Sequence, residues 1–213
     1  MVNVENKALN KKIGANVFAY FARMKLFPAN TFTPTQGRLL VADPFLDDEY
    51  FRRAVVLLIE HNEKGSLGFV LNKPVELRLH EVIDDFPQYD EPVHFGGPVQ
   101  RDQLYYIHTL GDTIEGSIQV SKNLWWLGDF TQVRELLAAG ILGPHNVRFF
   151  IGYAGWEAEQ LEREMKDRSW YVARASHELI FDRNFNENWS HVMRSISADH
   201  ALMANFPEDP SLN

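Results

Sequence analysis

The chain has 213 residues, of which 45% are hydrophobic, and it contains no cysteine. This length and composition are typical of one globular domain, and the lack of cysteine excludes disulfides, thiolate nucleophiles and cysteine-ligated metal centres. The net charge of −8 is unevenly distributed, because residues 1–40 carry six basic groups and one acidic group, whereas residues 41–213 carry 15 basic and 28 acidic groups. We expect the acidic body to repel nucleic acid, so that only the N-terminal arm offers a basic contact to DNA.

Residues 1–36 are predicted to form an N-terminal helix followed by a proline-containing connector. Apolar side chains recur at helical spacing over residues 13–24, which favours an amphipathic helix over a secretory signal. Pro28 and Pro34 then interrupt any periodic pattern. Because no apolar run approaches the roughly 18 residues of a membrane span, we expect a cytoplasmic protein whose domain covers residues 37–213.

Strand and helix signals alternate through the body. Strands are predicted where β-branched and apolar residues run between turn residues, at residues 38–43, 54–60, 67–72, 92–99, 103–110, 117–121 and 146–155. Helices are predicted from helical spacing and end signals, beginning near Leu79 and covering residues 130–139, 156–168 and 187–203. This intermixing favours an α+β or mixed α/β domain over a regular doubly wound sheet.

A Glu60-His61-Asn62 trio follows the second predicted strand. Turn-forming residues across positions 61–66 predict a hairpin there, which explains most of the pattern. A histidine can act as an acid or base near neutral pH. Neighbouring residues of a strand point to opposite faces, however, so Glu60 is poorly placed to orient His61. A structural role is therefore favoured over catalysis.

Ser66 lies in a Gly-Ser-Leu-Gly stretch that partly matches a nucleophile elbow. That motif needs glycine two residues before and two residues after the serine, and position 64 is lysine. The motif also needs a strand-to-helix junction, whereas this stretch joins two predicted strands. The sequence therefore disfavours a serine nucleophile.

Two further stretches contain paired glycines. Gly96 and Gly97 match no nucleotide-binding motif, so a tight bend beside a strand is favoured over an anion site. Residues 152–164 predict a strand-to-helix junction in which Trp156 anchors a capped helix. The eight histidines lack ligand spacing, so we expect no metal and no cofactor.

Three of these stretches resemble, in order and spacing, the bacterial YqgE/AlgH family. They cover residues 37–74, 95–112 and 149–165, and the resemblance extends from about Gly37 to beyond Asp182. The long N-terminal extension is similar to the form found in Bacteroidetes members. The resemblance implies a single compact domain with a bifurcated, partly barrel-like β-sheet flanked by helices. It implies no established reaction, cofactor or catalytic residue, although some members are described as transcriptional regulators.

The family's motif positions supply the candidate site. We interpret the following residues as candidates for binding a ligand or partner: Glu60, His61, Asn62, Asn72, Gly96, Gly97, Trp156, Gln160 and Glu162. The chain departs from the family at Glu159, where glycine is usual, and at Ser66, where alanine is common.

The leading hypothesis is a cytosolic protein that binds a protein or small molecule, with a role in transcription regulation left open. One alternative is a hydrolase-type enzyme that uses His61 as acid or base, with Asn62, Asn72 or Glu162 positioning the substrate. The other is DNA contact through the N-terminal arm. The sequence does not determine the ligand, the pathway or the oligomeric state.

Overall fold

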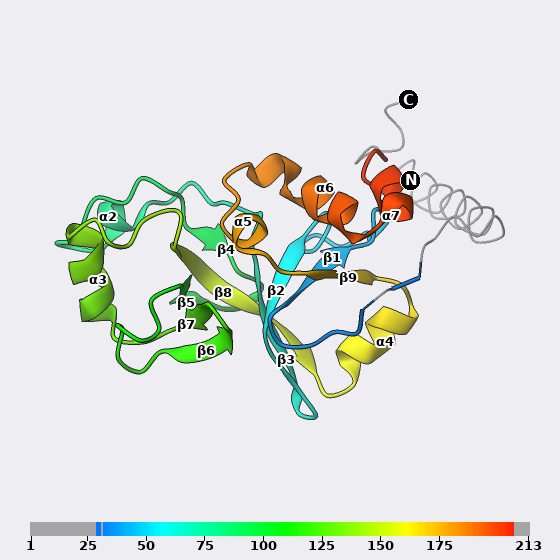
Figure 1. Ribbon diagram of the computed structural model, residues 1–213, viewed down its shortest axis with the longest axis horizontal. Helices are drawn as coiled ribbons and strands as arrows, with labels where there is room; N and C mark the ends of the chain where they lie inside the picture. Colours follow the sequence, from blue (N-terminus) through cyan, green and yellow to red (C-terminus); the bar gives the residue numbers. More distant parts are fainter. Residues whose placement is uncertain (1–28, 31, 207–213) are drawn as a thin grey trace, which may run out of the picture.

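The strand β8 (Val147–Glu157) lies at the centre of the sheet in the computed structural model, which describes residues 29–30 and 32–206 (Figure 1). The strands pair in the order β6-β7-β5-β8-β3-β2-β1-β9, and β4 also pairs with β8. Only the β4–β8 pair is parallel among the described strands. The remaining strands are β1 (Arg38–Ala42), β2 (Val55–Asn62), β3 (Gly65–Val70), β4 (His94–Phe95), β5 (Val99–His108), β6 (Ile118–Ser121), β7 (Leu124–Trp126) and β9 (Trp170–Arg174).

The sheet curls, so that strands from both of its ends share one core. Leu39 of β1 packs in the same buried cluster as Val120 of β6 and Trp126 of β7. The Gln36 side chain donates a 3.0 Å hydrogen bond to the carbonyl of Gln119, which joins the segment before β1 to the outer strand β6. The single domain and the partly barrel-like sheet implied by the family resemblance are therefore confirmed.

Helices flank this sheet at both ends (Figure 1). They are α2 (Leu79–Val82), α3 (Phe130–Ala138), α4 (Gln160–Lys166), α5 (His177–Ile180), α6 (Phe185–Ile196) and α7 (Ala198–Met203). The prediction of one helix over residues 187–203 is wrong, because Ser197 adopts an extended conformation and separates α6 from α7. Its hydroxyl accepts a hydrogen bond from the N–H of His200 and so caps α7.

Strands β7 and β9 were missed by sequence reasoning. β9 pairs with β1 over all five of its residues, and the Asn30 side chain bonds the carbonyl of Trp170 and the N–H of Val172. The connector before the domain therefore covers this edge of the sheet, and such cover protects an edge strand from unwanted pairing. The predicted N-terminal helix lies outside the described residues.

The boundaries of two predicted elements also change. The hairpin turn is confined to residues 63–64, because β2 runs to Asn62 and β3 starts at Gly65. The predicted helix over residues 156–168 is wrong at its start: Trp156 and Glu157 belong to β8, and α4 begins at Gln160. Trp156 and Glu157 pair with Ser66 and Gly65 of β3, and this pairing keeps both residues in strand β8.

Glu159, directly before α4, has an unfavourable backbone conformation. Its φ of 60° lies in the left-handed region, which costs a residue with a side chain about 1 kcal/mol. Glycine adopts this φ without that cost, which explains why the family prefers glycine here. We expect Glu159→Gly to raise the free energy of unfolding by up to about 1 kcal/mol, measured by urea denaturation.

The matched control for this substitution is Arg163→Gly in the interior of α4. Glycine there should lower the free energy of unfolding by about 1 kcal/mol. A loss of stability in Glu159→Gly as large as in the control would contradict the prediction.

The buried His94 makes stability depend on pH. Its ring packs edge-on against Phe185 with centroids 4.7 Å apart. Burial, and then the positive charge of Arg148, lower the pKa of His94 from 6.5 to about 3. Since the folded-state pKa is depressed, the unfolded chain takes up the proton first. This contribution to stability is complete above pH 6.5 and is lost as pH falls toward the folded pKa, by roughly 1.4 kcal/mol for each pH unit.

We expect His94→Leu to abolish this slope. The measurement is the difference in free energy of unfolding between the wild type and the variant, taken by urea denaturation from about pH 8 to about pH 4. Asp43, whose pKa is raised to about 6 by burial, contributes an opposite slope that is common to both proteins and cancels. The control is the exposed His145→Leu, which removes a histidine elsewhere on the chain and should keep the slope that His94 causes. A flat difference for His94→Leu would refute the prediction.

Candidate functional site

A β-bulge in β2 decides which way the His61 side chain points. The register between β2 and β3 shifts by one residue between Leu58 and Glu60. Beyond the shift, Glu60 lies opposite Leu67, and His61 lies opposite Ser66. Directly opposite residues share a face of a sheet and neighbouring residues alternate, so Glu60 and His61 lie on opposite faces, in agreement with the alternation in the sequence. The bulge re-aims His61 toward α4.

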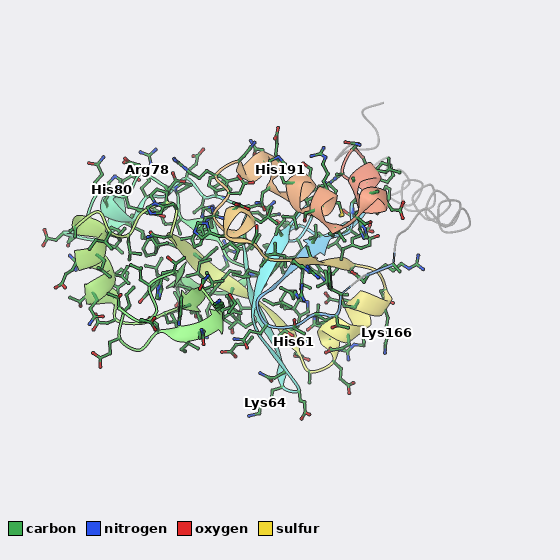
Figure 2. The ribbon with its side chains drawn as sticks, in the orientation of Figure 1. His61, Lys64, Arg78, His80, Lys166 and His191 are labelled. Carbon is green, nitrogen blue, oxygen red and sulfur yellow. The ribbon has the colours of Figure 1, made fainter. Side chains whose placement is uncertain are left out.

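On the face that α4 covers, His61 contacts two polar side chains. Its Nδ1 lies 2.8 Å from Ser66 Oγ, and its Nε2 lies 3.9 Å from Glu162 Oε1. The labelled His61 in Figure 2 lies where the β2–β3 hairpin meets α4. The side chains of His61 and Glu162 are 18% and 47% exposed, so the cluster is half-open to solvent. Glu162, and not Glu60, is therefore the carboxylate beside His61.

Glu164 connects the candidate residues Trp156 and Gln160. Its Oε2 accepts hydrogen bonds from the indole N–H groups of Trp156 and Trp170, at 2.9 and 2.7 Å. Its Oε1 accepts a 2.9 Å bond from Gln160 Nε2, and Gln160 Oε1 accepts from the Glu157 N–H at 3.0 Å. This carboxylate was missed by sequence reasoning. Its spacing of four residues from Gln160 on a helix is the signal that could have identified it.

An open depression of about 630 Å³ lies at the hairpin end of β2, β3 and β8. It is lined by Glu60, Asn62, Lys64, Gly65, Ser66, Leu67, Val99, Tyr153, Gly155, Trp156, Glu157 and Gln160. Gly155 has no side chain to fill this space: a Cβ there would lie 3.2 Å from the Tyr153 ring and 3.6 Å from Val99 Cγ2. Each of the three stretches that carry the family resemblance contributes lining residues.

Asn72 lies apart from this depression. Its Oδ1 accepts a 2.9 Å hydrogen bond from the Val55 N–H, and its Nδ2 donates a 2.8 Å bond to the carbonyl of Arg53. The side chain thus holds the backbone at the start of β2. This bonding assigns Asn72 a structural role.

Gly96 and Gly97 also do not line the depression, and both are buried against β8. A Cβ at Gly97 would lie 2.2 Å from the backbone N of Ala154. The two glycines therefore permit a close passage of backbone against backbone, as the tight-bend interpretation requires. Of the nine candidates, four line the depression (Glu60, Asn62, Trp156 and Gln160), and His61 and Glu162 form the adjacent cluster.

Within residues 29–30 and 32–206, no group of three or more His, Asp or Glu residues is placed to hold a metal ion. In the same part of the chain, no helix is long and apolar enough to cross a membrane.

Comparisons with known proteins agree with this fold. A family model described as AlgH-like (DUF179) matches residues 39–201. A UPF0301 protein of Chlorobaculum parvum is 46% identical over 177 residues, which cover 83% of this chain and 95% of that protein. A UPF0301 protein of Cytophaga hutchinsonii is 38% identical over 180 residues, which cover 84% and 99%.

Two solved structures have a similar fold. The solution structure of the AlgH protein from Pseudomonas aeruginosa aligns with a TM-score of 0.65 and 30% identity, over 83% of this chain and 97% of that one. The crystal structure of a Corynebacterium diphtheriae protein aligns with a TM-score of 0.70 and 23% identity, over 85% and 96%. These matches confirm the family resemblance noted in the sequence.

The Glu164 network generates a prediction for the site. Glu164→Ala leaves the indole N–H groups of the buried Trp156 and Trp170 without their acceptor. Each unsatisfied buried donor costs about 1–3 kcal/mol, so we expect a loss of roughly 3 kcal/mol in the free energy of unfolding and a change in tryptophan fluorescence. Lys166→Ala, on the exposed side of the same helix, should change stability by less than about 0.5 kcal/mol. Equal effects of the two substitutions would contradict the network.

Proposed function

This chain belongs to the AlgH-like family, and from that premise we propose that it binds a short segment of a partner protein in the depression at the hairpin end of β2, β3 and β8. The observation that carries the proposal is the convergence of the three family-like stretches on this one surface. Glu60 and Asn62 come from the first stretch, Val99 from the second, and Tyr153 and Trp156 from the third. Exposed polar residues gathered on one surface are a stronger sign of binding than buried ones, which usually serve packing.

The shape of the depression favours a protein segment over a small molecule. Small-molecule sites enclose most of the ligand surface, whereas this depression is widely open to solvent. An open surface with a few anchoring contacts suits an extended peptide, whose remaining surface stays in water.

The lining predicts the chemistry of the bound segment. Leu67, Val99 and Tyr153 offer apolar and aromatic contacts, and the exposed carboxylates of Glu60 and Glu157 outnumber the single ammonium of Lys64. The body of the chain is acidic as well, with 28 acidic groups against 15 basic groups in residues 41–213. We infer a segment with an apolar or aromatic anchor next to Lys or Arg, because complementary charges steer encounter and select partners.

We place this interaction in the cytosol, which the absence of cysteine fits. A regulatory role would follow if the bound segment belonged to a transcription factor. Binding through this depression needs no contact between the chain and DNA.

The test is a selection of short peptides from a displayed random library, followed by fluorescence anisotropy with the synthetic peptides. We expect enriched sequences that combine an aromatic residue with Lys or Arg, and affinities that weaken as salt is raised. The double variant Glu60→Lys, Glu157→Lys should weaken binding by at least about tenfold, equivalent to about 1.4 kcal/mol.

Glu178→Lys in α5 is the matched control, because it makes an equal charge change per residue outside the depression. It should leave the affinity unchanged. Amide shifts in NMR spectra should map bound peptide to Leu67, Val99 and Tyr153. Failure to enrich basic-aromatic peptides, or equal weakening by the control, would overturn the proposal.

A further inference from the structure

Ser66 and His61 form a cross-strand pair at the edge of the depression. They lie directly opposite each other on β3 and β2, and their side chains meet at 2.8 Å between Ser66 Oγ and His61 Nδ1. A nucleophile and a base within about 2.6–3.2 Å of each other are the first requirement of covalent catalysis by serine. The bulge in β2 creates this pair, because the pairing register shifts by one residue just before His61.

Glu162 completes the arrangement from α4. Its Oε1 lies 3.9 Å from His61 Nε2, so the carboxylate favours the tautomer whose proton is on Nε2. That tautomer leaves Nδ1 as an acceptor for the Ser66 hydroxyl proton. Distances in an enzyme without its substrate are often longer than in the reacting complex, so 3.9 Å is compatible with an orienting role.

Ser66 is accessible from the solvent side. It is partly exposed and lines the depression next to Lys64 of the hairpin turn. The Lys64 side chain carries an ammonium group, a type of donor that stabilises a developing oxyanion. Trp156 of β8 lies directly opposite Ser66 and lines the same depression, so it offers an aromatic surface on the face of the sheet that carries Ser66 and His61.

We propose that Ser66 is a nucleophile that accepts an acyl group from small carboxylic esters with an apolar or aromatic leaving group, with His61 as its base and Glu162 as the residue that orients His61. This activity is independent of peptide binding, although it uses one side of the same depression. This proposal does not require the nucleophile-elbow motif that the sequence around Ser66 lacks, because here His61 contacts Ser66 from the neighbouring strand.

The reaction has two steps. Ser66 Oγ bonds to the ester carbonyl carbon while its proton passes to His61 Nδ1. The bond from that carbon to the alcohol oxygen then breaks, and His61 returns the proton to the departing alcohol. In the second step water attacks the acyl-serine, giving a proton to His61, and the carboxylic acid departs as the Ser66 oxygen regains that proton.

The first experiment treats the full chain with p-nitrophenyl acetate and, separately, with a fluorophosphonate. We expect release of p-nitrophenol above the Ser66→Ala background and a single phosphonylated residue, Ser66, in peptide mass spectra. Ser66→Ala and His61→Gln should each lower the rate by roughly 100-fold, within the range of general acid–base catalysis. His61→Gln keeps a hydrogen-bonding side chain opposite Ser66, so loss of the base is separated from loss of structure.

Ser121→Ala is the matched control, because Ser121 is an exposed serine of strand β6. It should leave both the rate and the labelling unchanged. For Glu162→Gln we expect kcat to fall several-fold with KM unchanged, and for Glu162→Asp, which keeps the carboxylate, we expect a smaller fall in kcat. A purely structural role of Glu162 would not separate kcat from KM in this way.

Three outcomes would overturn the proposal. The first is a wild-type rate equal to that of Ser66→Ala. The second is phosphonylation at a residue other than Ser66. The third is a His61→Gln variant that keeps the wild-type rate while its far-ultraviolet circular dichroism is unchanged. None of these outcomes affects peptide binding, so failure here is distinguishable from failure of the partner-binding proposal.

Discussion

The whole fold depends on one place where backbone passes directly against backbone. A Cβ at Gly96 would lie 2.2 Å from the carbonyl oxygen of Gly152, and Gly152 itself has a φ of 66°. Strand β4 pairs with Phe150 and Ile151, and β5 pairs with the same two residues. The chain therefore pairs with one edge of β8 through β4, crosses β8, and pairs with the other edge through β5. At the crossing the two backbones come so close that only glycine, which has no side chain, fits between them.

This crossing also sets the position of the candidate site. Immediately after it, Val99 at the start of β5 pairs with Tyr153 of β8, and β8 then continues alongside β3. The side chains of Val99 and Tyr153 line the depression beside Gly155. The glycine pair is thus a structural element that positions the walls of the depression without lining it.

A second constraint fixes the opposite face of the same strands. Glu164 holds Trp156 of β8 and Trp170 of β9 to helix α4 through two indole hydrogen bonds. Because α4 is held in this way, Glu162 on the same helix reaches His61. The carboxylate of Glu164 therefore organises the packing of α4, whereas the carboxylate of Glu162, two residues earlier, lies beside His61. The two are told apart only by their contacts.

Local signals were sufficient for many elements of the fold. The Asp129 side chain accepts a hydrogen bond from the Gln132 N–H and caps α3, a contact that local spacing can identify because capping involves residues three positions apart. The Gln132 side chain, by contrast, accepts from the Glu115 N–H, which is 17 residues away in the chain. Strand β9 was missed because its state depends on β1, which lies about 130 residues earlier in the chain. Pairing over such a separation leaves little trace in a five-residue window.

The sequence by itself determined the alternation that places Glu60 and His61 on opposite faces, and the short-range caps and turns, because these depend on bond geometry within a few residues. It also identified the stretches that converge on the depression. Only the tertiary structure decided what His61 meets. A one-residue bulge in β2 moves the His61 side chain to the face of the sheet that α4 covers. The docking of α4 then brings the Glu162 carboxylate, about 100 residues away in sequence, to 3.9 Å from the His61 ring. The β2–β3 register and the docking of α4 depend on the packing of the whole core, so a local sequence pattern cannot predict them.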